Sequence, residues 1–371
     1  MRASDVKTSN SFSLHTCRFA LVFVLAAVLL LGVSGCNRKG HRVLEVNYVS
    51  AVQATLRDQV ATIYNRVGTV KNGDRVEVLE REKRFSRVRT GDGTEGWIEQ
   101  RYLVNQETYD GLQKLTRENL SDPVQAPGVL RTETNLHLTP GRETEHLYQL
   151  SALAKVSVLK RATAEKPGTA LAPAKSGKAP GAKMPGVKTS FGPVLEDWWL
   201  VRDEQNRVGW VLARMVDLDV PLEVAQYAEG QRFVAFFVLN QVQDSGKDKD
   251  KEGTGKKVSQ YLCAISEPHD GLPYDYDQIR VFTWNVRKHR YETAYREHGL
   301  KGVLPVTVTN ENFDKEGTLP VFILRVKDDA GNVSERKYKL NTPIVRRVLV
   351  AGEQKAAPKP EPKLAKKRRR N

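Results

Sequence analysis

The sequence predicts an all-β protein: two small β-barrels, then an antiparallel β-sandwich or barrel domain, with disordered basic linkers. Short runs that alternate apolar and polar residues, such as RVEVLE (75–80), are separated by turn signals such as NGD and GDG. A Gly-Trp-aliphatic motif occurs twice, in TEGWIEQRYL (94–103) and RVGWVLARMV (207–216). After Pro221, about seven more strand-like runs follow, broken by turns.

The two motifs belong to an internal repeat. Residues 55–81 align without a gap with residues 135–161, and residues 84–103 align with residues 197–216. The offset is 80 in the first block and 113 in the second, so the second copy carries an insertion of 33 residues. Five short strands in about 60 residues are typical of a small barrel.

Nearly all of the insertion lies at residues 162–193, which are rich in Ala, Pro, Gly, Ser and Lys. Such a composition has little to bury and predicts a disordered, cationic loop. It falls between the strand-like runs KVSVLKR and DWWLVR, at the tip of a hairpin. Because the entropic cost of loop closure grows slowly with length, we expect the barrel to tolerate it. The Pro-Lys-Arg-rich tail, residues 346–371, is also predicted to be disordered.

Both copies of the repeat resemble bacterial SH3 (SH3b) domains. The resemblance is carried by an aromatic residue and a valine before a hairpin turn, then Gly-Trp-aliphatic, then a final Tyr or Met followed by an aliphatic residue. The second copy also has NLHLTPG, near the family's Asn-aliphatic-x-x-Gly-Pro pattern with Pro and Gly reversed, whereas the first has TLRDQVA there. The two domains would cover residues 47–105 and 129–219, joined by a linker with a short helix at 106–128.

SH3-like barrels bind peptides in a groove lined by aromatic rings, so the resemblance implies a set of ligand-binding candidates. Trp97 and Trp210 stand at strand–loop junctions and fit a place in the barrel core equally well. Trp199 is expected to be exposed, because its counterpart in the first copy is Ser86, and the neighbouring Trp198 is then expected to face the core. The candidates are Phe85, Trp97, Tyr102, Trp199 and Trp210.

The N-terminus, residues 1–35, is predicted to be a signal peptide. Fifteen uncharged residues, Phe19–Val33, follow three basic ones, and a membrane-spanning helix needs about 20 apolar residues. The following VSGC resembles the lipobox of bacterial lipoproteins, which implies lipidation of Cys36 and a lipidated tether at 36–46. Two or more acyl chains hold a protein stably on a membrane, whereas one binds marginally. The alternative is a short anchor helix left in place.

Charge and cysteine content fit an exported protein. The net charge of the chain is +15, and removing residues 1–35 takes away three basic residues and one acidic residue, which leaves +13. Outside the cytoplasm the available polyanions are lipid headgroups, lipopolysaccharide and wall carboxylates, so no nucleic-acid partner is expected. Cys263 would be left without a disulfide partner. We expect an extracytoplasmic protein, lipid-anchored to the cell membrane or the outer membrane.

The β-rich C-terminal domain, residues 222–345, is expected to have no catalytic, metal or cofactor site. Cys263 lies mid-strand in QYLCAIS, which favours a buried, inert thiol over a nucleophile with His269, His289 or His298 as its base. Neither these histidines nor the acidic run PHDGLPYDYDQ has the spacing of a zinc or calcium site.

The sequence therefore predicts a membrane-anchored envelope lipoprotein that binds peptidoglycan or a wall-associated partner through its SH3b-like domains, without catalysis. Two alternatives stay open. One is a cell-wall hydrolase whose chemistry lies in residues 222–345. The other is a structural spacer within an envelope complex.

Overall fold

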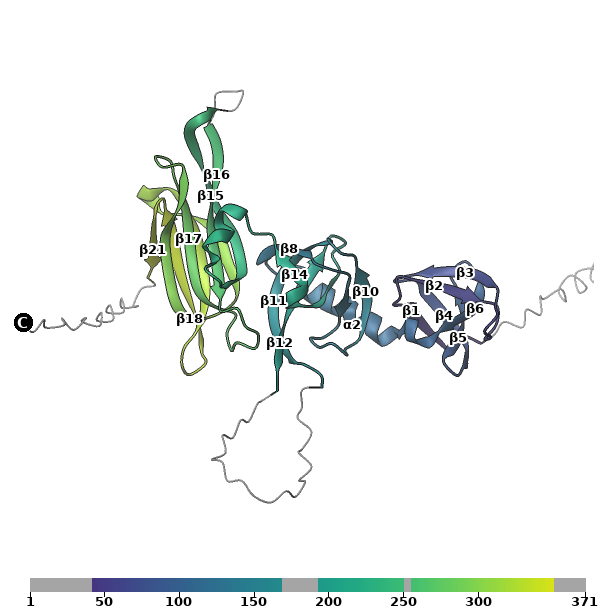
Figure 1. The fold of residues 1–371 in the computed structure, drawn as a ribbon. Coiled ribbons are helices and arrows are strands. Elements are labelled where there is room, and N and C mark those ends of the chain that lie inside the picture. Colours follow the sequence, from purple (N-terminus) through teal and green to yellow (C-terminus); the bar gives the residue numbers. More distant parts are fainter. Residues whose placement is uncertain (1–41, 169–192, 250–254, 350–371) are drawn as a thin grey trace, which may run out of the picture. The chain divides into compact units, whose positions relative to one another are not determined.

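The structure is a computed structural model that describes residues 42–168, 193–249 and 255–349 (Figure 1). It is all-β, as the sequence predicts, and its strands form three antiparallel sheets of seven strands each. The predicted signal peptide, Cys36 and most of the insertion lie outside the described residues. Among the described residues, no helix has the length and apolar character needed to cross a membrane.

The first sheet, purple in Figure 1, forms a small barrel with the strand order β3-β2-β6-β5-β4-β1-β7. Its core contains Leu56, Val76, Val88 and Ile98, none more than 1% exposed. The barrel begins two residues before the predicted boundary, because Glu45 already pairs with β4. Its elements are β1 (Glu45–Val49), β2 (Gln53–Arg57), β3 (Arg66–Lys71), β4 (Arg75–Glu82), β5 (Phe85–Thr90), β6 (Glu95–Glu99), η1 (Gln100–Tyr102) and β7 (Leu103–Asn105).

The second sheet repeats this topology strand for strand, in the order β10-β9-β13-β12-β11-β8-β14. The internal repeat of the sequence is therefore a repeat of the fold. Its elements are β8 (Ala126–Leu130), β9 (Thr134–His137), β10 (His146–Leu150), β11 (Lys155–Glu165), β12 (Leu195–Asp203), β13 (Val208–Leu212), η2 (Ala213–Met215) and β14 (Val216–Leu218).

Close packing explains the glycine of the repeated motif. A Cβ atom at Gly96 would lie 2.8 Å from Leu56 Cβ, and a Cβ atom at Gly209 would lie 2.6 Å from Leu136 Cβ. Both distances are shorter than real side chains allow, so only glycine lets these strands approach each other. Leu56 and Leu136 are equivalent in the repeat, and the same contact is therefore made in both barrels.

Helix α2 (Gln106–Asn119) joins the two barrels, where the sequence predicts a connecting helix. It begins after Asn105, whose side chain accepts a hydrogen bond from Thr108 N at 2.9 Å and caps the helix. Tyr109 stacks on Tyr48 of the first barrel, with 3.9 Å between ring centroids. Leu115 packs against the second barrel.

The third sheet, green to yellow in Figure 1, is a meander in which each strand pairs with the next. At β16 both faces of this sheet are buried: Leu262 belongs to one apolar cluster, and Cys263 belongs to another that also holds Val224 of α3. Its elements are α3 (Leu222–Ala225), η3 (Gln226–Ala228), β15 (Arg232–Lys249), β16 (Gly255–Ser266), β17 (Tyr276–Asn285), β18 (Arg290–Asn312), η4 (Asp314–Glu316), β19 (Thr318–Lys327), β20 (Val333–Asn341) and β21 (Ile344–Val348).

Two predicted boundaries of disorder are wrong. Strand β11 pairs with β12 as far as Glu165, so the first residues of the range 162–193 are ordered by the sheet ladder. Strand β21 likewise pairs with β20 as far as Val348, although the predicted tail begins at residue 346. In both places the composition is polar, but backbone pairing with a neighbouring strand continues past the point where apolar alternation fades. Residues 169–192 and 350–371 lie outside the described residues.

Candidate functional site

Aromatic and arginine side chains gather on one outer face of the first barrel. Strand pairing places Trp97 directly opposite both Arg57 of β2 and Arg87 of β5. The Arg57 guanidinium lies 4.1 Å from the ring centroid of Tyr64 and 5.2 Å from that of Phe85. We call Arg57, Tyr64, Phe85, Arg87 and Trp97 the aromatic–arginine face.

This face is open to solvent in part. Tyr64 is 38% exposed and Trp97 is half-buried, whereas Phe85 is 5% exposed and forms the floor. Arg57 lies 3.5 Å from Glu99 and Arg87 lies 3.0 Å from Glu95, and these partly exposed ion pairs hold the guanidinium groups beside the rings. Arginine held in this way can stack on planar groups and donate paired hydrogen bonds to carboxylates.

The equivalent face of the second barrel is apolar and covered. Trp210 lies opposite His137 and Leu200, which replace Arg57 and Arg87. Leu115 of α2 packs on this cluster together with Trp210, and Leu200 is 1% exposed. The two barrels share a fold, but they differ in what covers this face. Helix α2 packs on the face in the second barrel, whereas the same face of the first barrel is open.

The expectation that Trp199 is exposed is wrong. Trp199 is 2% exposed and belongs to the same apolar cluster as Val158 and Val201. Trp198 points to the opposite face, as alternation requires, and is also 2% exposed, edge-on to His137 with ring centroids 5.3 Å apart. The roles of the two neighbours are therefore reversed, because the strand turns Trp199, and not Trp198, toward the core.

The other predicted residues divide between the face and the core. Phe85 and Trp97 meet on the aromatic–arginine face, whereas Trp210 is half-buried under α2. Tyr102 is half-buried against the first core, and Arg101 stacks on its ring at 4.7 Å. No motif in the sequence indicated that Arg57 and Tyr64 belong to this face. Arg57 pairs directly with Trp97 between β2 and β6, which only the strand register shows.

The only thiol among the described residues is unsuited to nucleophilic chemistry. Cys263 is fully buried at 0% exposure in the middle of β16. Burial raises the pKa of its thiol to about 12, against a smaller opposing effect of the Arg280 charge. The thiol is therefore protonated at neutral pH, as expected of an inert buried cysteine.

The acidic residues of the turn between β16 and β17 form ion pairs with arginines. Asp270 lies 2.9 Å from Arg232, and Asp275 lies 3.2 Å from Arg161. The part of the chain that the structure describes contains no group of three or more metal-ligating side chains.

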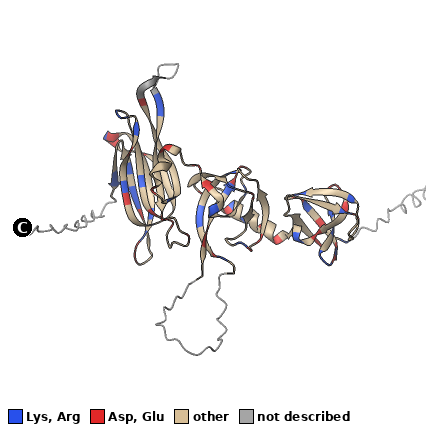
Figure 2. Ribbon diagram, in the orientation of Figure 1, with Lys and Arg blue, Asp and Glu red and all other residues tan. Residues whose placement is uncertain are grey.

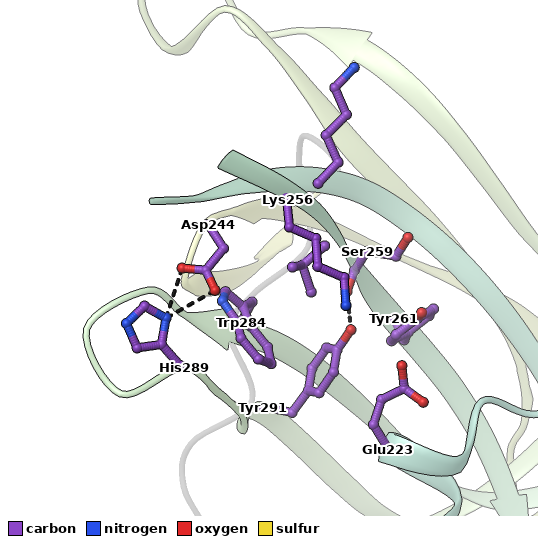
Figure 3. Close-up of a pocket in the computed structure, with 10 residues that line it drawn as sticks. Glu223, Asp244, Lys256, Ser259, Tyr261, Trp284, His289 and Tyr291 are labelled. Carbon is purple, nitrogen blue, oxygen red and sulfur yellow. Dashed lines mark hydrogen bonds and ion pairs between the residues drawn. The ribbon is translucent and has the colours of Figure 1, made fainter. Parts of the chain in front are cut away.

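A cavity of about 750 Å³ opens on the third sheet, where the sequence indicated no site (Figure 3). Trp284 and Tyr291 are edge-on with ring centroids 5.0 Å apart, and Tyr261 lies 5.6 Å from Tyr291. His289 Nδ1 lies 2.9 Å from the Asp244 carboxylate at one side. The lining is Glu223, Asp244, Lys256, Lys257, Val258, Ser259, Tyr261, Trp284, His289 and Tyr291.

Charge is balanced over the described residues. They contain 41 Lys and Arg and 39 Asp and Glu, and Figure 2 shows the two signs interspersed along the strands. Most of the +15 therefore belongs to segments outside them.

Comparison with known proteins assigns a family to part of the chain. Residues 53–104 match the family described as bacterial SH3 domain, which covers the first barrel from β2 to β7. No curated protein matches the chain.

Solved structures of low similarity were also found. An NlpC/P60 family protein from Bacillus cereus has 11% identity and a TM-score of 0.21, over 67% of this chain and 93% of its own. NlpC2 from Trichomonas vaginalis has 12% identity and a TM-score of 0.16, over 82% and 95%. NlpC1 from the same organism has 11% identity and a TM-score of 0.16, over 83% and 92%.

Proposed function

We propose that the protein is an envelope lipoprotein whose first barrel binds peptidoglycan or a wall-associated partner without catalysis. The family match at residues 53–104 supports wall binding, and the open aromatic–arginine face on that same barrel supplies a surface for it. The second barrel, which we also assign to the SH3b type from its strand order, would then support the first through α2.

The chemistry of the face suits the peptide part of the wall. Stem peptides offer planar amide groups and free carboxylates, and stacked arginines bind both kinds of group. Trp97 and Tyr64 add apolar contact area with few rotatable bonds, as is common at binding surfaces. The observation that carries the proposal is the Tyr64–Arg57–Phe85 stack beside Trp97.

Replacing Trp97 with alanine is expected to weaken binding to purified sacculi by about 5- to 30-fold, or about 1–2 kcal/mol, because an aromatic anchor is lost. Sedimentation of residues 37–371 with sacculi measures the affinity. The thermal midpoint should stay close to that of the wild type, since Trp97 lies outside the buried core.

Two matched charge variants separate the face from general adsorption. Arg57→Gln and Arg75→Gln remove the same charge from the same barrel, but Arg75 lies on β4 with its side chain 53% exposed. Only Arg57→Gln should weaken binding, and binding should persist at about 0.3 M salt, where exposed charges are strongly screened. If both variants weaken binding equally and salt abolishes it, the first barrel adsorbs to the wall by charge alone and the aromatic–arginine face is not a site. If neither weakens binding and salt still abolishes it, the basic segments 162–193 and 346–371 hold the wall and the barrels are spacers.

Cys36→Ser is expected to release the protein from membranes into the soluble fraction, because a lipid anchor needs the cysteine thiol. Membrane fractionation followed by immunodetection measures the distribution. Recovery of the uncleaved variant in the membrane fraction would support a retained anchor helix instead.

A further inference from the structure

The cavity on the third sheet has the lining of a ligand site. Its volume of about 750 Å³ lies within the range of roughly 300–1,000 Å³ typical of small-ligand pockets. Tyr261 and Tyr291 are each 7% exposed and form its floor, and Trp284 is half-buried beside them. An aromatic floor with a few polar groups around it is the usual composition of such pockets.

One donor of a cavity-lining residue has no partner. Trp284 Nε1–H is buried and makes no hydrogen bond to any described residue. A buried donor without a partner is unfavourable, so a ligand acceptor that reaches this N–H from the cavity would be favoured. Tyr291 differs, because its hydroxyl donates to Ser259 O at 2.9 Å and leaves its oxygen lone pairs to accept.

The charges around the rings balance. The lining has two basic residues, Lys256 and Lys257, and two acidic residues, Glu223 and Asp244. The Asp244 carboxylate contacts His289. In Figure 3 the rings of Trp284 and Tyr291 lie between the Asp244–His289 pair and Glu223. A pocket of this kind offers donors and acceptors together, without selecting strongly for either sign of charge.

We propose that this cavity binds a short segment of an uncharged glycan, with a sugar ring stacked on Trp284. Sugar hydroxyls both donate and accept hydrogen bonds, which matches the mixed lining. A pyranose ring also has an apolar C–H face, which matches the aromatic floor. This site lies on a different domain from the aromatic–arginine face, so it goes beyond the wall-binding function proposed above and does not depend on it.

The first experiment uses two neutral trisaccharides on residues 37–371 at about 0.3 M salt. Titration with the β-1,4-linked N-acetylglucosamine trimer, or with maltotriose, should change tryptophan fluorescence and release heat in calorimetry. Binding of the first would indicate wall glycan strands as the source, and binding of the second alone would indicate another polysaccharide. Binding of neither would overturn the proposal, as would binding of a free stem peptide in their place.

Variants then place the binding in the cavity. Trp284→Ala should lower the affinity at least about tenfold, in line with the loss of an aromatic anchor. Trp284→Phe keeps a ring against Tyr291 but lacks the N–H donor, so it should bind more weakly than the wild type with the same thermal midpoint. Arg75→Gln, on the first barrel and outside both surfaces, should bind the trisaccharide normally. Full affinity in Trp284→Phe and Trp284→Ala would overturn the assignment.

Charge variants test that the ligand is neutral. Glu223→Gln and Lys256→Gln each keep a polar group at the exposed rim of the cavity while removing a charge. Each should change the trisaccharide affinity by less than about threefold. A loss of more than tenfold in either one would mean that the pocket selects a charged ligand, and the glycan assignment would be wrong.

Discussion

Asp197→Ala is expected to lower the free energy of unfolding by about 3–5 kcal/mol, because the substitution removes the buried carboxylate that Arg161 and Arg232 share and leaves them only Asp275 and Asp270 as ion-pair partners. Asp197 is 0% exposed, and its carboxylate accepts hydrogen bonds from Arg161 Nη2 and Arg232 Nη2, both at 2.6 Å. Gly271 N donates to it at 3.0 Å. The Arg161 side chain is only 3% exposed, so water cannot replace the lost carboxylate. Guanidinium unfolding of residues 37–371 at neutral pH measures the loss.

A pair on the surface of the same barrel is the control. Arg131 and Asp217 form an ion pair with side chains 59% and 57% exposed, and such pairs contribute at most about 1 kcal/mol. Asp217→Ala should therefore have little effect. If Asp197→Ala were equally mild, Arg161 and Arg232 would have other compensation and the buried cluster would not be a stabilising link.

The same carboxylate predicts an acid dependence of stability. Burial raises the pKa of Asp197, but the hydrogen bonds from Arg161 and Gly271 and the charges of Arg161 and Arg232 outweigh burial, so the pKa is lowered. A lowered pKa contributes stability that is present above the unfolded value of about 3.9 and is lost as the pH falls toward the folded value. The stability gap between wild type and Asp197→Ala should therefore narrow on acidification below about pH 4.

Local patterns were enough to predict the repeated fold. Alternation placed Val76, Val78 and their counterparts in the cores, and the repeated Gly-Trp-aliphatic motif marked the strand that must pack against Leu56 or Leu136. These features depend on residues near in sequence or related by the repeat. The alternation and the motif can be recognised in the sequence without knowing which segments cover each barrel.

The candidate sites depended on contacts between distant segments, and sequence could supply them only in part. Phe85 and Trp97 were expected to contact ligand, but the open face also needs Arg57 and Tyr64, which only strand register brings beside them. Helix α2 closes the matching face around Trp210, which no local pattern indicates.

The cavity on the third sheet was missed for the same reason. Its lining comes from α3, β15, β16, β17, β18 and the turn that holds His289, and each segment contributes one to five residues to it. The one signal in the sequence was aromatic: Tyr261, Trp284 and Tyr291 stand in successive strands of a meander, where neighbouring strands bring side chains together.

Trp199→Ala is expected to lower the free energy of unfolding by about 3–5 kcal/mol, the usual cost of emptying a buried aromatic site. Trp199 is 2% exposed, and it also borders a cavity with Phe233 and Ala225, beyond the second barrel in sequence. Ser86 occupies the equivalent position of the first barrel at 1% exposure, so the barrel fold itself does not need a large ring there. The tryptophan is needed because the apolar cluster around it continues into the third sheet.

Trp199→Ser tests whether the ring is needed for the contact with the third sheet, because it gives the second barrel the residue that the first barrel has at this position. If the ring is needed only for the contact with the third sheet, Trp199→Ser should cost about as much as Trp199→Ala in guanidinium unfolding. Trp97→Ala, at a half-buried position of the first barrel, should leave the free energy of unfolding close to that of the wild type. Unchanged stability in both Trp199 variants, combined with weaker binding to sacculi, would instead mean that Trp199 contacts a ligand, as its position in the repeat first indicated.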